Sequence, residues 1–318
     1  MAKTAMFAAL LALALPGIAR ADQTPDASPP DPLGHPEDSQ VLDTDTDRHR
    51  RLTIPVQIGG QGPFEFMIDT GSQATVVSRQ LSERLQLEAI GTGTLVGIAS
   101  SRQVDLVELD GLEFADRVFD NLTSPLLEEQ YVGADGIIGL DSLQDLRVLI
   151  DFRSETISVA DAQSNIGRNG YEIIVRARRK LGQLIITDAE IEGVRTALII
   201  DTGSQFSIGN SALREKIRSR RTSSLTAIDV NGVAIVGDLT IAHQLSFGGM
   251  RFTDIPIAYA DSPAFAALGY ADRPALSLGM MHLRLFDRVA IDFSKRQVLF
   301  DLPRSVSRRD RTLRGGRR

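Results

Sequence analysis

The sequence predicts a mainly β protein composed of two duplicated lobes with short helices. The hexapeptide Ile-Asp-Thr-Gly-Ser-Gln occurs twice, at 68–73 and at 200–205. Apolar residues recur at matching distances from both copies, and glycine-bearing turns separate β-branched segments in both halves. At ordinary residue frequencies, one Asp-Thr-Gly is expected only about 0.05 times in such a chain. Two copies within identical hexapeptides therefore indicate an internal repeat.

Each copy predicts the same local unit of strand, turn, strand and short helix. Apolar residues alternate before and after each aspartate, as expected for strands that lead into and out of a turn. The matched pairs are Phe66 with Leu198, Ile68 with Ile200, and Val76 with Ile208. Ser78 and Asn210 follow at equal distances from the two aspartates and favour helix N-caps. Leucine or isoleucine then recurs at helical spacing in both halves.

Later in each half a second signature recurs. The first half has Ile137-Ile138-Gly139, and the second has Leu278-Gly279, where Ser277 stands in place of the first apolar residue. A strand ending in Ile-Asp-Phe follows in both halves, at 150–152 and at 291–293. The duplication therefore extends over most of the chain.

The start of the chain predicts an export signal. Lys3 precedes an apolar stretch of 11 residues from Ala5 to Leu15, and Ala19-Arg20-Ala21 forms a small-residue cleavage site. A membrane-spanning helix needs roughly 18 apolar residues, so the stretch is too short to cross a bilayer. We expect a cleaved signal peptide and a mature chain that begins at Asp22; an uncleaved anchor is the alternative.

The sequence therefore predicts five parts. Residues 22–47 contain five Pro and eight Asp or Glu with no Lys or Arg, which indicates a linker or a pro-segment. The parts are a signal peptide at 1–21, this acidic Pro-rich segment at 22–47, an N-terminal lobe at 48–162, a C-terminal lobe at 168–303 and a basic Arg-rich tail at 304–318.

Composition excludes several kinds of site and partner. The chain has no cysteine, which excludes disulfides, thiol catalysis and thiolate metal sites. The four His have no zinc-site spacing, and no metal or cofactor is expected. The net charge of -6 combines +6 in the tail, from seven Arg against Asp310, with -12 elsewhere. An acidic body argues against nucleic acid as a partner, whereas the tail is either a solvated end or a contact to anionic surfaces.

The paired Asp-Thr-Gly-Ser loops, each followed by an apolar-Gly turn, resemble those of the pepsin and retropepsin superfamily of aspartic proteases. The resemblance covers roughly residues 50 to 302, and the lobe sizes look most like those of bacterial single-chain retropepsin-like proteases of the periplasm. It implies a bilobal acid protease fold with pseudo-twofold related β-barrel lobes. It also implies that Asp69 and Asp201 are the catalytic pair and that Thr70 and Thr202 bond across the axis.

The remaining loop residues suit the same arrangement. Gly71 and Gly203 permit a tight turn and a close approach of backbone, and the hydroxyls of Ser72 and Ser204 are expected to donate to the carboxylates. Two adjacent carboxylates do not both ionise easily, so the pair keeps one proton over a range of pH. The ionised member can then activate a water while the protonated member donates to the developing oxyanion. Which aspartate holds the proton stays open.

A protease of this kind needs hairpins that close over the peptide. The corresponding segments are Thr94–Val107, turning near Ala99-Ser100-Ser101, and Ala227–Leu239, turning at Asn231-Gly232. We therefore expect a monomeric aspartic endopeptidase in the periplasm that acts on a polypeptide, such as the extracytoplasmic part of a membrane protein. Two alternatives remain, a peptide-binding pseudoprotease and an assembly factor of the cell envelope.

Overall fold

The computed structural model describes residues 6–8, 53–162, 171–218 and 221–303. The acidic segment at 22–47, the basic tail at 304–318 and nearly all of the expected signal peptide lie outside these ranges. So do residues 163–167, between the two expected lobes. Within the described residues no helix is long and apolar enough to cross a membrane.

The first half of the chain forms one curled sheet of ten strands in the order β1-β5-β6-β9-β4-β10-β3-β2-β7-β8. Its strands are β1 (Met6–Ala8), β2 (Thr53–Ile58), β3 (Gln61–Ile68), β4 (Val76–Ser78), β5 (Ala89–Val96), β6 (Ser101–Leu109), β7 (Leu112–Phe114), β8 (Arg117–Phe119), β9 (Leu122–Leu127) and β10 (Gly136–Ile138). Its helices are α1 (Arg79–Leu85), α2 (Glu129–Val132) and α3 (Leu140–Leu143). Strand β1 falls within the expected signal peptide and pairs in parallel with β5.

The second half forms an eight-stranded sheet in the order β14-β15-β16-β21-β17-β20-β19-β18, and β15 also pairs with β19. Its strands are β14 (Arg178–Lys180), β15 (Gln183–Ile191), β16 (Val194–Ile200), β17 (Ile208–Gly209), β18 (Arg221–Ile228), β19 (Ala234–Phe247), β20 (Met250–Tyr259) and β21 (Ala275–Leu278). Its helices are α4 (Ser211–Arg214), α5 (Pro263–Ala267) and α6 (Met280–Leu283). The extra pairing curls the sheet back on itself, and the expected mainly β, bilobal fold is confirmed.

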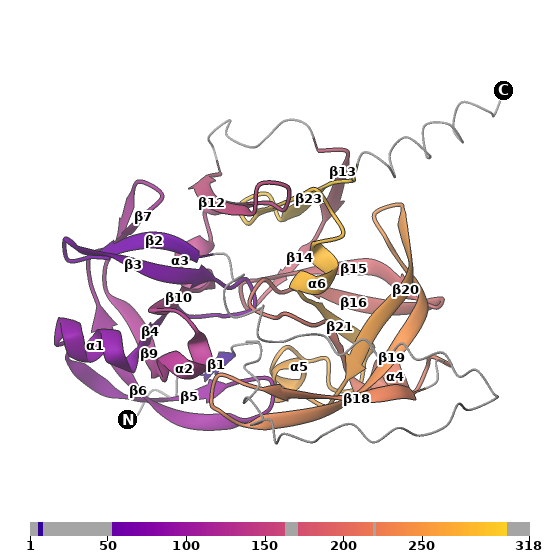
Figure 1. Ribbon diagram of the computed structural model, residues 1–318, viewed down its shortest axis with the longest axis horizontal. Helices are drawn as coiled ribbons and strands as arrows, with labels where there is room; N and C mark the ends of the chain where they lie inside the picture. The colour runs from indigo at the N-terminus through magenta and orange to yellow at the C-terminus, as the bar shows by residue number, and fades with distance from the viewer. Residues whose placement is uncertain (1–5, 9–52, 163–170, 219–220, 304–318) are drawn as a thin grey trace, which may run out of the picture.

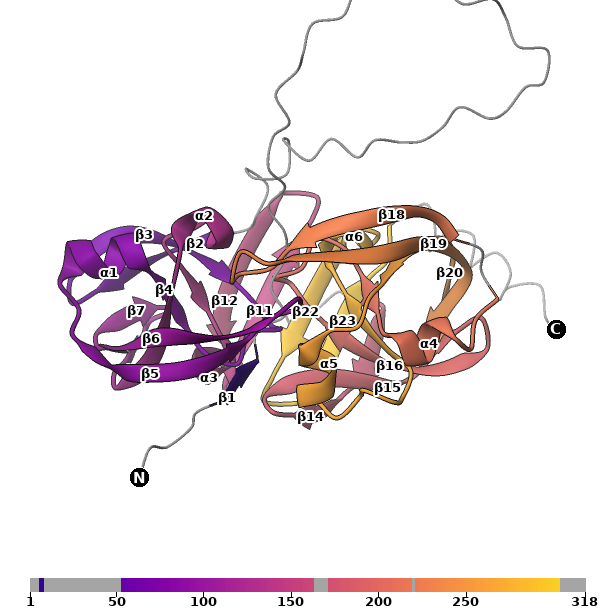
Figure 2. The ribbon, with the colours of Figure 1, turned by 90° about the horizontal axis from the view of Figure 1, so that it is seen from below.

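A third sheet joins the two halves. Its order is β12-β11-β22-β23-β13, and its strands are β11 (Leu146–Asp151), β12 (Thr156–Asp161), β13 (Ile173–Arg176), β22 (Arg288–Asp292) and β23 (Gln297–Asp301). Figure 1 shows this sheet at the top between the lobes, while the long hairpins β5–β6 and β18–β19 run along the opposite side. In Figure 2, seen from below, those two hairpins extend toward each other.

A buried ion pair crosses this shared sheet. Strands β11 and β22 run antiparallel, with Leu149 opposite Ala290 and Arg147 opposite Asp292. Nη2 of Arg147 lies 2.7 Å from Oδ2 of Asp292, and both side chains are only 2% exposed. The same nitrogen donates to the carbonyl oxygen of Ala162 at 2.8 Å. The first half contributes the buried guanidinium and the second half the buried carboxylate. Neither charge would be neutralised without the other half.

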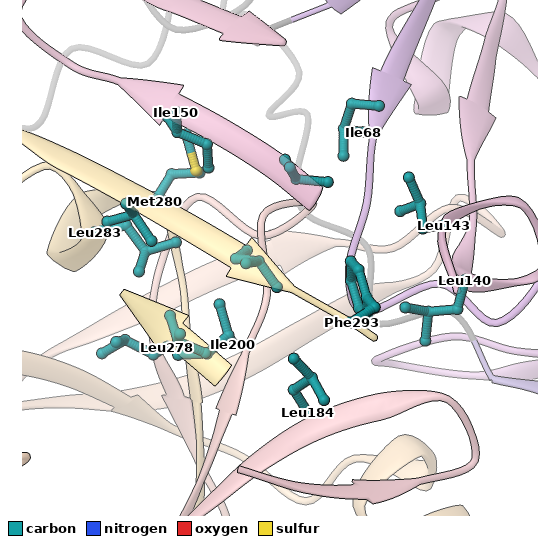
Figure 3. Close-up of a cluster of buried hydrophobic side chains, with 14 of the residues drawn as sticks. Ile68, Leu140, Leu143, Ile150, Leu184, Ile200, Leu278, Met280, Leu283 and Phe293 are labelled. Carbon is teal, nitrogen blue, oxygen red and sulfur yellow. The ribbon is translucent and has the colours of Figure 1, made fainter. Parts of the chain in front are cut away.

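The apolar core is continuous between the halves. One cluster of buried residues includes Ile68 and Leu143 from the first half and Ile200, Leu184 and others from the second. Figure 3 shows these side chains around Phe293, with Leu278 beside Ile200 and Met280 near Ile150. The strands that end at Ile68 and Ile200 are thus anchored in one common core.

The expected local unit is present in both halves. In the first, β3 leads through a turn into β4 and α1; in the second, β16 leads into β17 and α4. The side chain of Ser78 accepts from the amide of Leu81 at 3.1 Å, and that of Asn210 accepts from the amide of Leu213 at 3.0 Å. Both predicted N-caps are therefore confirmed, since each satisfies an amide in the first turn.

Candidate active site

The two aspartates are held at the ends of matching strands. Strand β3 pairs in parallel with β10, and β16 pairs in parallel with β21. Just beyond these pairings, the amide of Asp69 donates to the carbonyl of Ile138 at 3.1 Å, and the amide of Asp201 donates to the carbonyl of Leu278 at 3.1 Å. The apolar-Gly signatures found in the sequence therefore support the backbone of both aspartates.

The threonines of the two loops bond to the opposite lobe. The hydroxyl of Thr70 donates to the carbonyl of Ile200 at 2.9 Å, and that of Thr202 donates to the carbonyl of Ile68 at 2.8 Å. Each hydroxyl also accepts the backbone amide of the other threonine, at 3.0 and 3.2 Å. These reciprocal bonds fix the two loops against each other across a pseudo-twofold axis.

Each loop glycine lies against the opposite carboxylate. A Cβ at Gly203 would stand 2.3 Å from Cγ of Asp69, and a Cβ at Gly71 would stand 2.8 Å from Oδ1 of Asp201. A carbon atom cannot come so close to a heavy atom to which it is not bonded, so any side chain at these positions would force the loops apart. The glycines thus allow the two carboxylates to face each other.

The inner oxygen of each carboxylate accepts backbone amides from its own loop. Oδ1 of Asp69 accepts from Gly71 at 2.7 Å and from Ser72 at 3.1 Å. Oδ1 of Asp201 accepts from the amides of Gly203 and Ser204, both at 3.1 Å. These amides fix the orientation of both side chains.

The expected role of the serine hydroxyls is wrong. The hydroxyl of Ser72 donates to the carbonyl of Ala74, and that of Ser204 donates to the carbonyl of Phe206, both at 2.8 Å. Short hydroxyl side chains readily bond to a backbone group two residues away, and that local bond prevails here. These serines support the carboxylates through their amides, while their hydroxyls brace the turn.

A hydroxyl does reach one carboxylate, but it comes from outside the loops. Ser277, on β21, donates to Oδ2 of Asp201 at 2.7 Å. Both Asp69 and Asp201 are fully buried. Burial raises the pKa of Asp201 to about 7, while hydrogen bonds from Ser277 and from the amides of Gly203 and Ser204 oppose this rise. A raised pKa keeps a proton on the pair toward neutral pH.

Two further polar contacts support the loops, and the sequence analysis did not identify them. The side-chain amide of Gln183 donates to the carbonyl of Gly71 at 2.7 Å, so the second lobe holds the first loop directly. The hydroxyl of Ser207 accepts from the amide of Gly279 at 2.9 Å and bonds to Nδ1 of His282 at 2.6 Å. Burial lowers the pKa of His282 to about 4, so this imidazole is neutral at physiological pH.

The two expected hairpins are present, and each places its tip in the opposite lobe. Strands β5 and β6 meet at residues 97–100, and β18 and β19 meet at 229–233. Ile98 is fully buried in an apolar cluster made otherwise of second-lobe residues such as Phe265. Val230 is 1% exposed and packs in a cluster made otherwise of first-lobe residues such as Leu95.

Hydrogen bonds join the two hairpin turns. Oδ2 of Asp229 accepts from the hydroxyl of Ser100 at 2.7 Å and from the amide of Ala99 at 3.2 Å. The side-chain amide of Asn231 donates to the same Ser100 hydroxyl at 2.9 Å. The structure therefore shows the hairpins joined to each other, in a closed arrangement.

The described residues offer no evident metal site. No group of three or more His, Asp or Glu among them lies close enough together to hold a metal ion. The chemistry that the site permits without added groups is that of two facing, buried carboxylates.

Two β lobes joined by a shared sheet, with Asp-Thr-Gly loops bonded across their interface, define a duplicated, bilobal acid protease fold. A family model described as aspartyl protease matches residues 54–142 and 187–281, which together make up more than half of the chain. Each match contains one of the two loops. The protein therefore belongs to the aspartyl protease family. A search of curated proteins finds no match.

Proposed function

We propose that this protein is an aspartic endopeptidase that hydrolyses peptide bonds with Asp69 and Asp201. The observation that carries the proposal is the pair of identical loops that hold the two carboxylates face to face, each packed against the glycine of the other. Threonine bonds in both directions fix this geometry before any substrate arrives. Such preorganisation is what general acid and base groups require.

The reaction needs one proton on the pair. The ionised carboxylate accepts a proton from water as the water oxygen attacks the peptide carbonyl, and the protonated carboxylate gives its proton to the carbonyl oxygen. As the carbon–nitrogen bond of the tetrahedral intermediate breaks, the carboxyl group that took the water proton gives it to the leaving nitrogen. The other carboxylate takes back the hydroxyl proton as the carbonyl forms again, which restores the singly protonated pair. The raised pKa supports this scheme, because burial of the two facing carboxylates keeps one proton on the pair at mildly acidic to neutral pH, whichever member holds it.

Access to the carboxylates requires the hairpins to open. Both aspartates are fully buried, and Ile98 and Val230 are buried in the opposite lobes. An extended polypeptide is the substrate that suits a site covered by two β hairpins, because their backbones can pair with it. A single chain supplies both carboxylates, which supports a monomeric enzyme.

We further propose that the enzyme acts in the periplasm, on an envelope protein such as the extracytoplasmic part of a membrane protein. The support is the signal-like sequence at 1–21. Mass spectrometry of the exported protein should find an N-terminus at or near Asp22. A cytoplasmic protein that retains residues 1–21 would overturn both the location and this choice of substrate.

The function is tested by cleavage of a denatured protein by the parent chain and by the Asp69→Asn and Asp201→Asn variants. Each variant should lose essentially all turnover while it remains folded, because both carboxylates are needed in one step. Asp254→Asn is a matched control, since Asp254 is exposed on β20 with a φ of 57° that asparagine also tolerates. If either site variant retains more than a few per cent of the activity, the two-carboxylate mechanism is wrong. A parent chain that binds peptide but cleaves no faster than the variants is a pseudoprotease.

A further inference from the structure

The two halves differ at one buried position beside the paired carboxylates. In β21, Ser277 pairs with Ile199 and the next residue, Leu278, with Ile200. In β10, the corresponding register places Ile137 opposite Met67, one residue before the partner of Ile68. Ser277 and Ile137 therefore occupy equivalent places, and only the second half has a hydroxyl there.

The hydroxyl of Ser277 is directed at one carboxylate. It donates to Oδ2 of Asp201 at 2.7 Å, and both residues are fully buried. The other hydrogen bonds to this carboxylate come from the amides of Gly203 and Ser204 on Oδ1. All three donors are uncharged, and the ionisable group that faces Asp201 is Asp69 of the opposite loop.

We propose that Ser277 is a positioning residue that makes the two carboxylates unequal, so that Asp201 is the ionised member and Asp69 carries the shared proton. The proposal rests on the proposed function. A hydroxyl that donates to a carboxylate favours its ionised form, and the effect is strong where water is excluded. During attack, the water proton then passes to Asp201, and the proton of Asp69 passes to the substrate carbonyl oxygen. The charge that was on Asp201 ends on Asp69.

The pH profile of kcat/KM distinguishes the two possible assignments. If Asp201 is the ionised member, the first ionisation of the pair takes place at Asp201. Loss of the Ser277 hydroxyl then raises the pKa of that first ionisation, and the acidic limb moves to higher pH. If Asp201 holds the proton instead, the same change delays the second ionisation, and the alkaline limb moves. For Ser277→Ala we expect the acidic limb to rise by about one pH unit. This shift should exceed any shift of the alkaline limb.

Two further variants separate this effect from a general loss of packing. Ser277→Thr keeps the hydroxyl and should keep the parent profile. Ser124→Ala removes a hydroxyl that is equally buried, on β9, and has no hydrogen-bond partner among the described residues. It should leave both limbs unchanged. Movement of the alkaline limb alone in Ser277→Ala, or of neither limb, overturns the proposal.

A second measurement does not depend on turnover. In an Asp69→Asn background, Asp201 titrates without its partner, and the carbon resonance of its carboxyl group reports its ionisation by NMR. Ser277→Ala should raise the midpoint of that titration by about one unit, and Ser277→Thr should not. If cleavage depends on both aspartates but neither the acidic limb nor this midpoint moves, the inference fails and the proposed function stands. Absence of aspartate-dependent cleavage refutes the proposed function itself, whatever the titration shows.

Discussion

Replacing Arg147 by methionine should destabilise the whole protein, because it leaves a buried carboxylate without its counter-charge. Oδ2 of Asp292 accepts from Nε of Arg147 at 3.1 Å and from Nη2 at 2.7 Å, and both side chains are 2% exposed. Breaking a buried pair by removal of one partner costs about 3 to 5 kcal/mol. Domains of ordinary stability unfold at a cost of about 5 to 15 kcal/mol, so the loss is a large fraction of the total.

Urea unfolding, followed by fluorescence and by far-UV circular dichroism, measures this free energy. The double variant Arg147→Met with Asp292→Leu removes both charges and should be more stable than Arg147→Met alone. Arg153→Met is the control in the turn between β11 and β12 of the same sheet, because Arg153 pairs with Asp151 at 3.2 Å with side chains 44% and 31% exposed. That pair is open to solvent and should contribute about 1 kcal/mol or less. A loss below about 1 kcal/mol for Arg147→Met, or strict additivity in the double variant, would refute this reasoning.

Three other outcomes are expected. Burial raises the pKa of Asp201, in its facing pair with Asp69, to about 7. The pair therefore keeps a proton that the unfolded chain releases at about pH 4, and the stability that this proton contributes at low pH is lost as the pH rises toward 7. Melting curves against pH should show a smaller loss for Asp201→Asn, and an unchanged slope would contradict the raised pKa. Ser100→Ala removes the hydrogen bond from this hydroxyl to Asp229, so amide hydrogen exchange in the turn at 229–233 should be at least about tenfold faster. Equal exchange rates in parent and variant would show that this bond does not hold the hairpins together. Replacing Ser72 and Ser204 together by alanine should lower the free energy of unfolding by about 1 kcal/mol for each lost hydroxyl bond. Since neither hydroxyl bonds to a carboxylate, the pH profile of activity should not move, and a shifted profile would count against the hydrogen bonds described.

The features that the sequence predicts well are those set by neighbouring residues. The caps at Ser78 and Asn210, the strand and helix spacing and the positions of both hairpins depend on short stretches of chain, and the structure confirms them. The duplication also predicts that two equivalent loops exist. The duplication does not predict the sheet that the two halves share. That sheet depends on the pairing of β11 with β22, which joins residues more than 130 positions apart.

Side-chain partners within the site are harder to predict. A serine in a tight loop can use its amide or its hydroxyl, and composition alone does not decide between a carboxylate and a nearby carbonyl, as Ser72 illustrates. Ser277 is visible in the sequence as a departure from the apolar signature, but only the register of β21 shows that it reaches Asp201. The exchange of Ile98 and Val230 between lobes depends on contacts across the interface and leaves no local signal.

Because each hairpin tip packs in the opposite lobe, the active site can assemble only late in folding. Ile98 completes an apolar cluster of the second lobe, and Val230 completes one of the first, so neither half can finish its core before the other is present. Contacts between residues so distant in sequence form late and slowly. A chain that is partly synthesised or partly folded therefore has no facing pair of carboxylates. Under the proposed function, the protein could cut polypeptides only after these last long-range contacts have formed.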